Sequence, residues 1–232
     1  MSKSFYANIL ASGLTFHSQP IVSLKDKSVV GHELLARLKV GDSYVPPHDF
    51  IPDIEKAGLY GVLDQKLSEY VVRYLDSTDD SMFVSINVPN IESLRFQSLN
   101  AEVGERAHRV HLELLETVEW SCASHIKEVK QAHDLNYKIF LDDFGTGQSN
   151  LKTLLCTCID GVKLDRTMLL KFIREERQES LAHLVDMIYS LEKQIVFEGI
   201  EAKEQEQFIA KLHTDAFAQG YLYGRPDILG YE

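Results

Sequence analysis

The chain has 232 residues, of which 44% are hydrophobic and 25% are charged, an ordinary composition for a globular protein with a large core. Its formal net charge of −11 argues against a protein that binds a nucleic-acid polymer through a generic basic surface. Three cysteines, an odd number, favour reduced thiols and a cytoplasmic location over a disulfide framework. The sequence shows no signal peptide and no apolar run of the ~20 residues that a membrane span needs.

Short apolar runs rich in β-branched and aromatic residues recur along the chain and predict eight strands. In chain order they are Phe16–Ser23, Val30–Leu38, Phe83–Val88, Val110–Leu115, Lys138–Leu141, Gly161–Leu164, Ile195–Phe197 and Phe217–Tyr221. Amphipathic patterns predict helices between most of them, at Asp49–Leu75, Ile91–Leu99, Cys122–Leu135, Leu169–Leu191 and Lys203–Lys211. Eight strands that alternate with helices predict an α/β fold, a closed (β/α)8 TIM-like barrel.

One connection differs from this pattern. Only the segment LKDKSVV separates the first two strands, and a parallel return needs a crossover of a dozen or more residues. We therefore expect the first strand to run antiparallel to the second. Because the sequence contains no linker, repeat or low-complexity segment, we expect residues 1–232 to form a single domain.

Polar side chains occur near the C-terminal ends of seven predicted strands, where (β/α)8 barrels carry their chemistry. They are Glu33, Asn87, Glu113, the pair Asp142 and Asp143, Lys163, Glu198 and Gln219. Taken singly, each also fits a solvated side chain, a turn or a helix cap. Taken together, five carboxylates in one barrel mouth would strongly disfavour folding without counter-ions.

Hard divalent cations that prefer oxygen ligands, Mg²⁺ or Mn²⁺, would compensate these charges. Five carboxylates and one amide suffice for two ions that share a bridging carboxylate. Two ions about 3.5–4 Å apart are typical of phosphodiester hydrolysis, so the pattern favours a hydrolase of that class.

The same residues lie in a series of motifs that resembles the EAL-type cyclic di-GMP phosphodiesterases of bacteria. From about Phe16 to Pro226 the chain reads QPIV, GHELLAR, SINV, LELLE, LDDFGTGQSNL, DGVKLD, FEGIE and QGYLYGRP, in the family's order. The resemblance implies a (β/α)8 barrel with an antiparallel first strand. It also implies metal-dependent hydrolysis of cyclic di-GMP to linear pGpG.

Residue roles follow from the resemblance, position by position. It implies that Glu33, Asn87, Glu113 and Asp142 hold one metal ion, and that Asp142, Asp143 and Glu198 hold the second. Lys163 would contact the attacking water or the scissile phosphate. The residues expected around the substrate are Gln19, Leu35, Arg37, Asp165, Glu201, Gln219 and Pro226. Glu116 matches the glutamate that orders the loop after the fifth strand, which in the family couples activity to dimerisation, so we expect a homodimer.

Three positions depart from the family pattern. The triplet that names the family reads Glu-Leu-Leu with Leu34 in the middle, Phe197 replaces a small residue, and Asn150 replaces a serine. Because side chains alternate along a strand, Leu34 and Phe197 should point away from the ligands beside them. These departures bear on the rate of reaction and leave every ligand in place.

Two other functions fit the sequence. One is a receptor that binds cyclic di-GMP, or another protein, with weak or no catalysis. The other is a barrel enzyme that cleaves a different phosphoester. Turnover of cyclic di-GMP distinguishes a phosphodiesterase from the receptor. A panel of cyclic dinucleotides distinguishes a cyclic di-GMP phosphodiesterase from an enzyme that cleaves a different phosphoester.

Overall fold

A computed structural model of the chain describes residues 10, 12–88, 96–114, 126–146 and 151–229. Eight strands close into a barrel in the order β1-β9-β8-β7-β6-β5-β4-β2, and β2 pairs again with β1. Their bounds are β1 Leu14–Ser23, β2 Val29–Val40, β4 Phe83–Val88, β5 Val110–Leu114, β6 Lys138–Phe144, β7 Gly161–Leu164, β8 Gln194–Phe197 and β9 Phe217–Gln219. Strand β1 is antiparallel to both neighbours, whereas the remaining pairs are parallel. The predicted (β/α)8 TIM-like barrel with an antiparallel first strand is confirmed.

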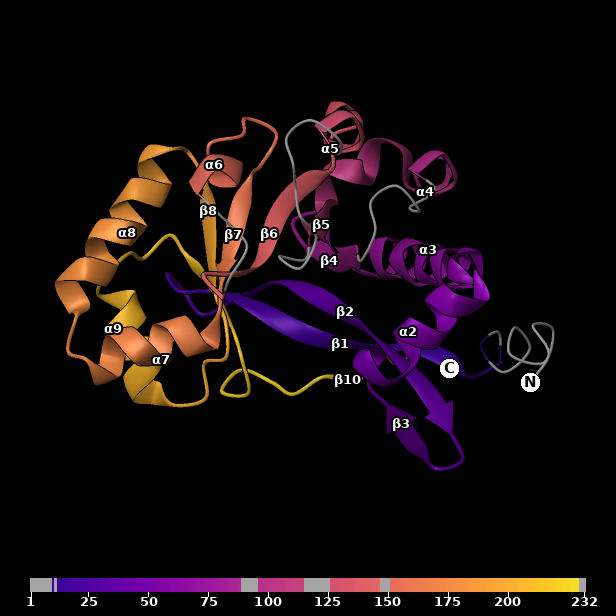
Figure 1. The fold of residues 1–232 in the computed structure, drawn as a ribbon, viewed down its shortest axis with the longest axis horizontal. Helices are drawn as coiled ribbons and strands as arrows, with labels where there is room; N and C mark the ends of the chain where they lie inside the picture. Colours follow the sequence, from indigo (N-terminus) through magenta and orange to yellow (C-terminus); the bar gives the residue numbers. More distant parts are fainter. Residues whose placement is uncertain (1–9, 11, 89–95, 115–125, 147–150, 230–232) are drawn as a thin grey trace.

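Helices cover the outside of this barrel (Figure 1). They are α2 Pro47–Ala57, α3 Tyr60–Ser77, α4 Phe96–Val103, the 3-10 helix η1 Gly104–Arg109, α5 Ile126–Asp134, α6 Leu151–Leu154, α7 Arg166–Arg174, α8 Gln178–Ser190 and α9 Lys203–Ala210. The main hydrophobic core lies between helices and strands, and it contains buried side chains from both layers, such as Val71 of α3 and Ile86 of β4.

Two of the predicted helices are each two helices in the structure. The predicted helix Asp49–Leu75 breaks at Gly58, which adopts a left-handed φ of 61° and ends α2. The predicted helix Leu169–Leu191 breaks after Arg174, where Glu176 has a φ of 53°. A left-handed glutamate carries no sequence signal comparable to glycine, which is why the second break was missed.

The structure also contains two short strands that the sequence did not predict. Strand β3, Ser43–Val45, extends the end of β2 as a hairpin, and β10, Asp227–Ile228, pairs with His17 and Ser18 of β1. Strand β9 ends at Gln219, two residues earlier than expected. Tyr221 therefore lies in the segment beyond the strand.

An apolar floor fills the lower half of the barrel interior. Its members are Ile21, Phe83, Phe140 and Val196, with Val30 and Phe217 packed against them. Phe140, Val196 and Phe217 each lie two positions before a polar residue of the site, namely Asp142, Glu198 and Gln219. The ring of His111 stacks between Phe83 and Phe140, with centroid distances of 3.9 and 4.8 Å. Because successive inward residues of a strand are two apart, this floor lies directly beneath the polar layer at the mouth.

Gly31 leaves the space that the floor needs. A Cβ atom at this position would lie 2.6 Å from the ring carbons of Phe83 and 2.7 Å from its backbone oxygen. We predict that Gly31→Ala lowers the free energy of unfolding by about 1–3 kcal/mol, because a side chain rotation cannot relieve the clash with the backbone. Chemical denaturation of both proteins measures this difference, and an unchanged midpoint would contradict the packing described for the floor.

Candidate active site

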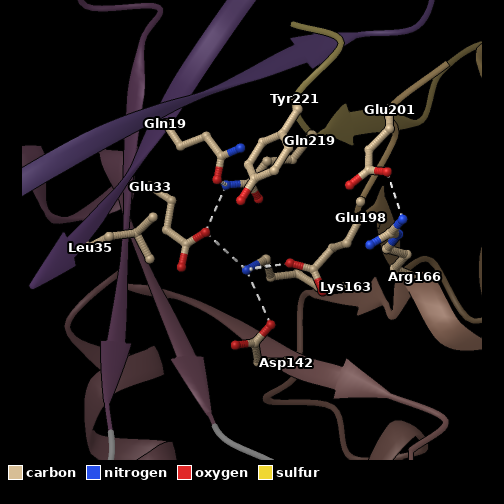
Figure 2. A pocket seen from close by; sticks show the side chains of 12 residues that line it. Gln19, Glu33, Leu35, Asp142, Lys163, Arg166, Glu198, Glu201, Gln219 and Tyr221 are labelled. Carbon is tan, nitrogen blue, oxygen red and sulfur yellow. Dashed lines mark hydrogen bonds and ion pairs between the residues drawn. The ribbon is translucent and has the colours of Figure 1, made fainter. Parts of the chain in front are cut away.

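The polar residues predicted at the strand ends meet at one mouth of the barrel. Figure 2 shows Glu33, Asp142 and Glu198 directed toward Lys163 from separate strands or strand ends. Glu33 lies in β2, Asp142 in β6 and Lys163 in β7, while Glu198 directly follows β8. The convergence follows from barrel geometry, since parallel strands end at the same rim.

Lys163 is the centre of this cluster and is only 2% exposed. Its Nζ atom lies 3.3 Å from Glu33 Oε2, 3.0 Å from Glu113 Oε2, 3.1 Å from Asp142 Oδ1 and 2.9 Å from Glu198 Oε1. Glu33, Glu113 and Asp142 are themselves buried. A single ammonium thus faces four carboxylates in a place that excludes most water.

Neutral side chains orient the carboxylates around the lysine. Asn87 Nδ2 donates to Glu33 Oε1 at 2.6 Å, and Gln219 Nε2 donates to Glu33 Oε2 at 2.7 Å. The same Gln219 nitrogen lies 3.3 Å from Gln19 Oε1. Ser85 Oγ donates to Glu113 Oε1. These bonds fix both oxygens of Glu33 and one oxygen of Glu113.

A bulge in β6 brings two adjacent aspartates to the same side. Between Leu141 and Phe144 the register with β7 shifts, and Asp143 adopts a left-handed φ of 53°. Regular alternation would direct Asp142 and Asp143 to opposite faces. Instead, carboxylate oxygens of Asp142, Asp143 and Glu198 lie within 4.8 Å of one another. Bulges and left-handed residues other than glycine occur frequently beside active sites.

The next residue of the loop, Gly145, is also in a conformation that suits glycine. Its φ is 103°, and a Cβ atom there would overlap the sulfur of Met168 in α7. The loop after β6 therefore packs closely on the start of α7. Gly147 and Asn150 lie outside the described residues, as does Glu116, so the predicted loop-ordering role of Glu116 stays a prediction.

Burial, the crowding of like charges and the ammonium of Lys163 shift the pKa values of the carboxyl groups in the cluster in different directions. Burial raises the pKa of Glu113 well above its usual value, and the charges of Glu33 and Asp142 add to this rise. Burial, with the charges of Asp142 and Glu33, raises the pKa of Glu198 to about 8. Burial alone would lower the pKa of Lys163, but the surrounding carboxylates raise it well above its usual value. Burial opposes ionisation of Glu33 too, yet Lys163 and the bonds from Gln219 and Asn87 bring its pKa below the usual value.

The donor set fits hard divalent cations. An ammonium has three N–H donors and cannot satisfy four carboxylates. Glu113 Oε2 and Asp142 Oδ1 are buried and, among the described residues, have the ion pair with Lys163 Nζ but no hydrogen bond. All the candidate ligand groups offer oxygen, which Mg²⁺ and Mn²⁺ prefer. Ions at this mouth would neutralise charges that one lysine leaves unbalanced.

A cavity of about 360 Å³ opens above the cluster. Of the residues predicted for catalysis or substrate binding, those that line it are Gln19, Glu33, Leu35, Asp142, Lys163, Glu198, Glu201 and Gln219. Four further residues line it that the sequence analysis did not single out, namely Arg166, Gly199, Gly220 and Tyr221. Each of them follows a predicted site residue within three positions, and this adjacency was the only signal available.

Three residues predicted to contact the substrate do not line the cavity. Asp165 is the N-cap of α7, where its Oδ1 accepts from the Thr167 N–H at 2.8 Å. Arg37 donates from Nη1 to the backbone oxygen of Ala36 at 2.8 Å. Neither these two residues nor Pro226 is among the described residues that line the cavity. The structure therefore gives Asp165 a structural role that the resemblance did not imply.

Two departures from the family pattern lie where alternation predicted them. Leu34 is 2% exposed and Phe197 is fully buried, and both belong to the hydrophobic core between barrel and helices. Their neighbours Glu33, Leu35 and Glu198 line the cavity. The larger side chains thus affect packing on the helix side.

Comparison with known proteins decides the family. The sequence model of the EAL domain matches residues 3–226, which is nearly the whole chain. The chain belongs to the EAL domain family. Among curated relatives, the probable cyclic di-GMP phosphodiesterase PdeB of Escherichia coli is 30% identical over 225 residues. That alignment covers 90% of this chain and 42% of PdeB, so the chain spans less than half the length of this relative.

Solved structures of the family superimpose on the fold. An EAL domain protein from Listeria monocytogenes gives a TM-score of 0.83 at 25% identity, with 98% of this chain and 94% of that chain covered. The EAL enzyme Bd1971, in a form bound to cAMP and cyclic di-GMP, gives a TM-score of 0.82 at 26% identity. This alignment covers 98% of our chain and 65% of the Bd1971 chain. Within the part of our EAL domain that the structure describes, no helix combines the length and apolar character needed to cross a bilayer.

The raised pKa of Glu198 makes the stability of the metal-free protein depend on pH. A carboxyl group that binds its proton more tightly in the folded state stabilises the fold below its unfolded pKa, and this contribution is lost as pH rises through the folded value. We predict that the protein in chelator becomes less stable between pH 6 and pH 9, because Glu198, whose pKa is about 8, ionises beside other carboxylates in this range.

Thermal unfolding in chelator and in Mn²⁺ at both pH values measures this effect. Mn²⁺ should raise the unfolding temperature more at pH 9 than at pH 6, because protons compete with the ion at the lower pH. Equal stability of the chelated protein at the two pH values would contradict the electrostatics described for the cluster.

Proposed function

We propose that this chain is a cyclic di-GMP phosphodiesterase that depends on two divalent cations, Mg²⁺ or Mn²⁺, and releases linear pGpG. The observation that carries the proposal is the set of buried carboxylates around Lys163, two of whose oxygens lack a hydrogen-bond partner among the described residues. Family membership and the names of relatives such as PdeB support the substrate.

The residues that would hold the ions are those at the strand ends. Glu33, Asn87, Glu113 and Asp142 would hold one ion, and Asp142 would share the second with Asp143 and Glu198. When bound, the ions would supply positive charge to the phosphoryl oxygens and lower the pKa of the attacking water. The close grouping of Asp142, Asp143 and Glu198 oxygens supports the second site.

Other side chains orient the substrate and exclude water. Lys163 would contact a phosphate oxygen or the attacking water through Nζ. In the protein without ions the surrounding carboxylates raise the pKa of this lysine. Gln219 and Asn87 hold the carboxylate of Glu33 in one orientation. The apolar floor below the cluster keeps bulk water from the lower side, which strengthens these electrostatic interactions.

The remaining parts of the proposal rest on the family. We infer one EAL-type domain over residues 1–232, a location in the bacterial cytoplasm, and a homodimer in which Glu116 orders the loop after β6. Lower cyclic di-GMP generally favours motility over biofilm in bacteria, so the activity would act in that direction. The match of the family model to residues 3–226 supports the single domain.

Incubation of the purified protein with cyclic di-GMP, with and without chelator, tests the activity. We expect pGpG only when Mg²⁺ or Mn²⁺ is present, and we expect Glu33→Gln to lower kcat at least about 100-fold, because the variant removes a charged oxygen ligand. The matched control is Glu179→Gln, an exposed position on α8. It should behave as the wild type.

Two results would contradict the proposal. Binding of cyclic di-GMP without turnover at any Mg²⁺ or Mn²⁺ concentration would favour the receptor instead. Cleavage of another cyclic dinucleotide in preference to cyclic di-GMP would favour a different phosphoester substrate. Chromatography of the products separates these outcomes.

A further inference from the structure

A second charged pair lies on the cavity wall, apart from the carboxylates that contact Lys163. Arg166 is the first residue of α7 and Glu201 follows β8, and both line the cavity. Arg166 Nη2 donates to Glu201 Oε2 at 2.6 Å, and the two side chains are 45% and 36% exposed. Figure 2 shows this pair beside Glu198, on the opposite side of the view from Leu35.

The backbone around the pair holds both side chains in place. Gly199 has a φ of 63°, and a Cβ atom there would lie 2.5 Å from Cβ and Cδ of Arg166. The missing side chain therefore lets the aliphatic part of Arg166 lie against the segment after β8. On the other side, Gln205 Oε1 accepts from the N–H groups of Glu201, at 2.7 Å, and Ala202, at 3.0 Å. The pair is thus positioned by its own loop and helix end.

The charges of the wall restrict what this pair can bind. In the proposed function the scissile phosphate lies at Lys163 and the ions, and the acidic residues that line the cavity are Glu33, Asp142, Glu198 and Glu201. Glu201 is neither a proposed metal ligand nor a carboxylate that contacts Lys163, so its charge would repel a phosphate placed on the pair itself. A neutral group that presents donors and acceptors side by side would instead match a carboxylate next to a guanidinium.

The guanine base has this arrangement of groups. Its O6 and N7 are acceptors that arginine recognises, and its N1–H and N2–H groups are donors that suit a carboxylate. Adenine presents an amino donor where guanine has O6, so it would place donors against the donors of Arg166. Among the described residues, Arg166 donates a hydrogen bond only from Nη2, to Glu201. Because Nη2 carries two hydrogens, its second hydrogen and an adjacent N–H of the guanidinium can still donate to a base.

We propose that Arg166 determines base specificity, by donating to O6 and N7 of one guanine while Glu201 accepts from the N–H groups of the same base. This inference rests on the proposed function, which supplies the cyclic dinucleotide. It adds a residue of this chain that the resemblance did not assign. Arg166 acts on recognition of the base and has no part in cleavage of the phosphodiester bond.

The test compares cyclic di-GMP with cyclic di-AMP in wild type, Arg166→Ala and Arg166→Lys. Turnover is measured in Mn²⁺, and binding is measured by equilibrium dialysis in chelator. Arg166→Ala should reduce the preference for cyclic di-GMP by about tenfold or more, the size typical of a lost arginine–guanine pair. We expect KM for cyclic di-GMP to rise with little change in kcat, and Arg166→Lys to recover only part of the preference, since lysine lacks the planar fork.

The matched control is Arg174→Ala, which removes an exposed arginine from the far end of the same helix. It should keep the wild-type preference, and thermal unfolding should show that all variants fold. An unchanged preference in an active Arg166→Ala variant would overturn the inference and leave the proposed function intact, as would an equal loss of affinity for both nucleotides. If wild type and Arg174→Ala neither bind nor cleave cyclic di-GMP, the proposed function fails and the inference fails with it.

Discussion

Electrostatic repulsion among buried carboxylates is the constraint on which the site depends. Glu33, Glu113, Asp142 and Glu198 come from four strands or strand ends, and the single ammonium of Lys163 contacts all of them. Removing one charge from water costs several kcal/mol even after relaxation, so such a cluster is retained only where function requires it. Burial and the neighbouring carboxylates raise the pKa of Glu113 and Glu198, so proton binding to these groups relieves part of the repulsion in the protein without ions. Divalent cations provide the alternative, with all of the carboxylates ionised.

The barrel below the site is built to keep this cluster in place. Inward residues form two layers, with an apolar floor around Phe83 and Phe140 and a polar layer above it. The floor packs beneath the carboxylates, and the cavity opens above them. The bulge in β6 departs from this layering, and it places Asp143 beside Asp142 on the mouth side. The apolar floor thus supports the carboxylates from below, and the bulge in β6 adds Asp143 to them.

Much of this arrangement follows from sequence pattern, and the limits have physical causes. Short apolar runs rich in β-branched and aromatic residues located the strands, and the rule that parallel strands end at one rim brought Glu33, Glu113 and Lys163 together. The bulge could not be predicted, since Asp142 and Asp143 carry no local signal for a left-handed residue. The break at Glu176 has the same cause. Asp165 caps α7, which its position before the helix explains, and its contact with the substrate stays a prediction from the resemblance. Arg166 was missed because its place on the wall depends on Gly199, which is distant in sequence.

Anomalous diffraction from crystals grown with Mn²⁺ tests the central claim most directly. We predict two peaks at the barrel mouth, one among Glu33, Asn87, Glu113 and Asp142 and one among Asp142, Asp143 and Glu198. We also expect that Lys163 then no longer contacts all four carboxylates. Crystals that contain Mn²⁺ but show no peak there, with Lys163 still in contact with all four, would contradict the account.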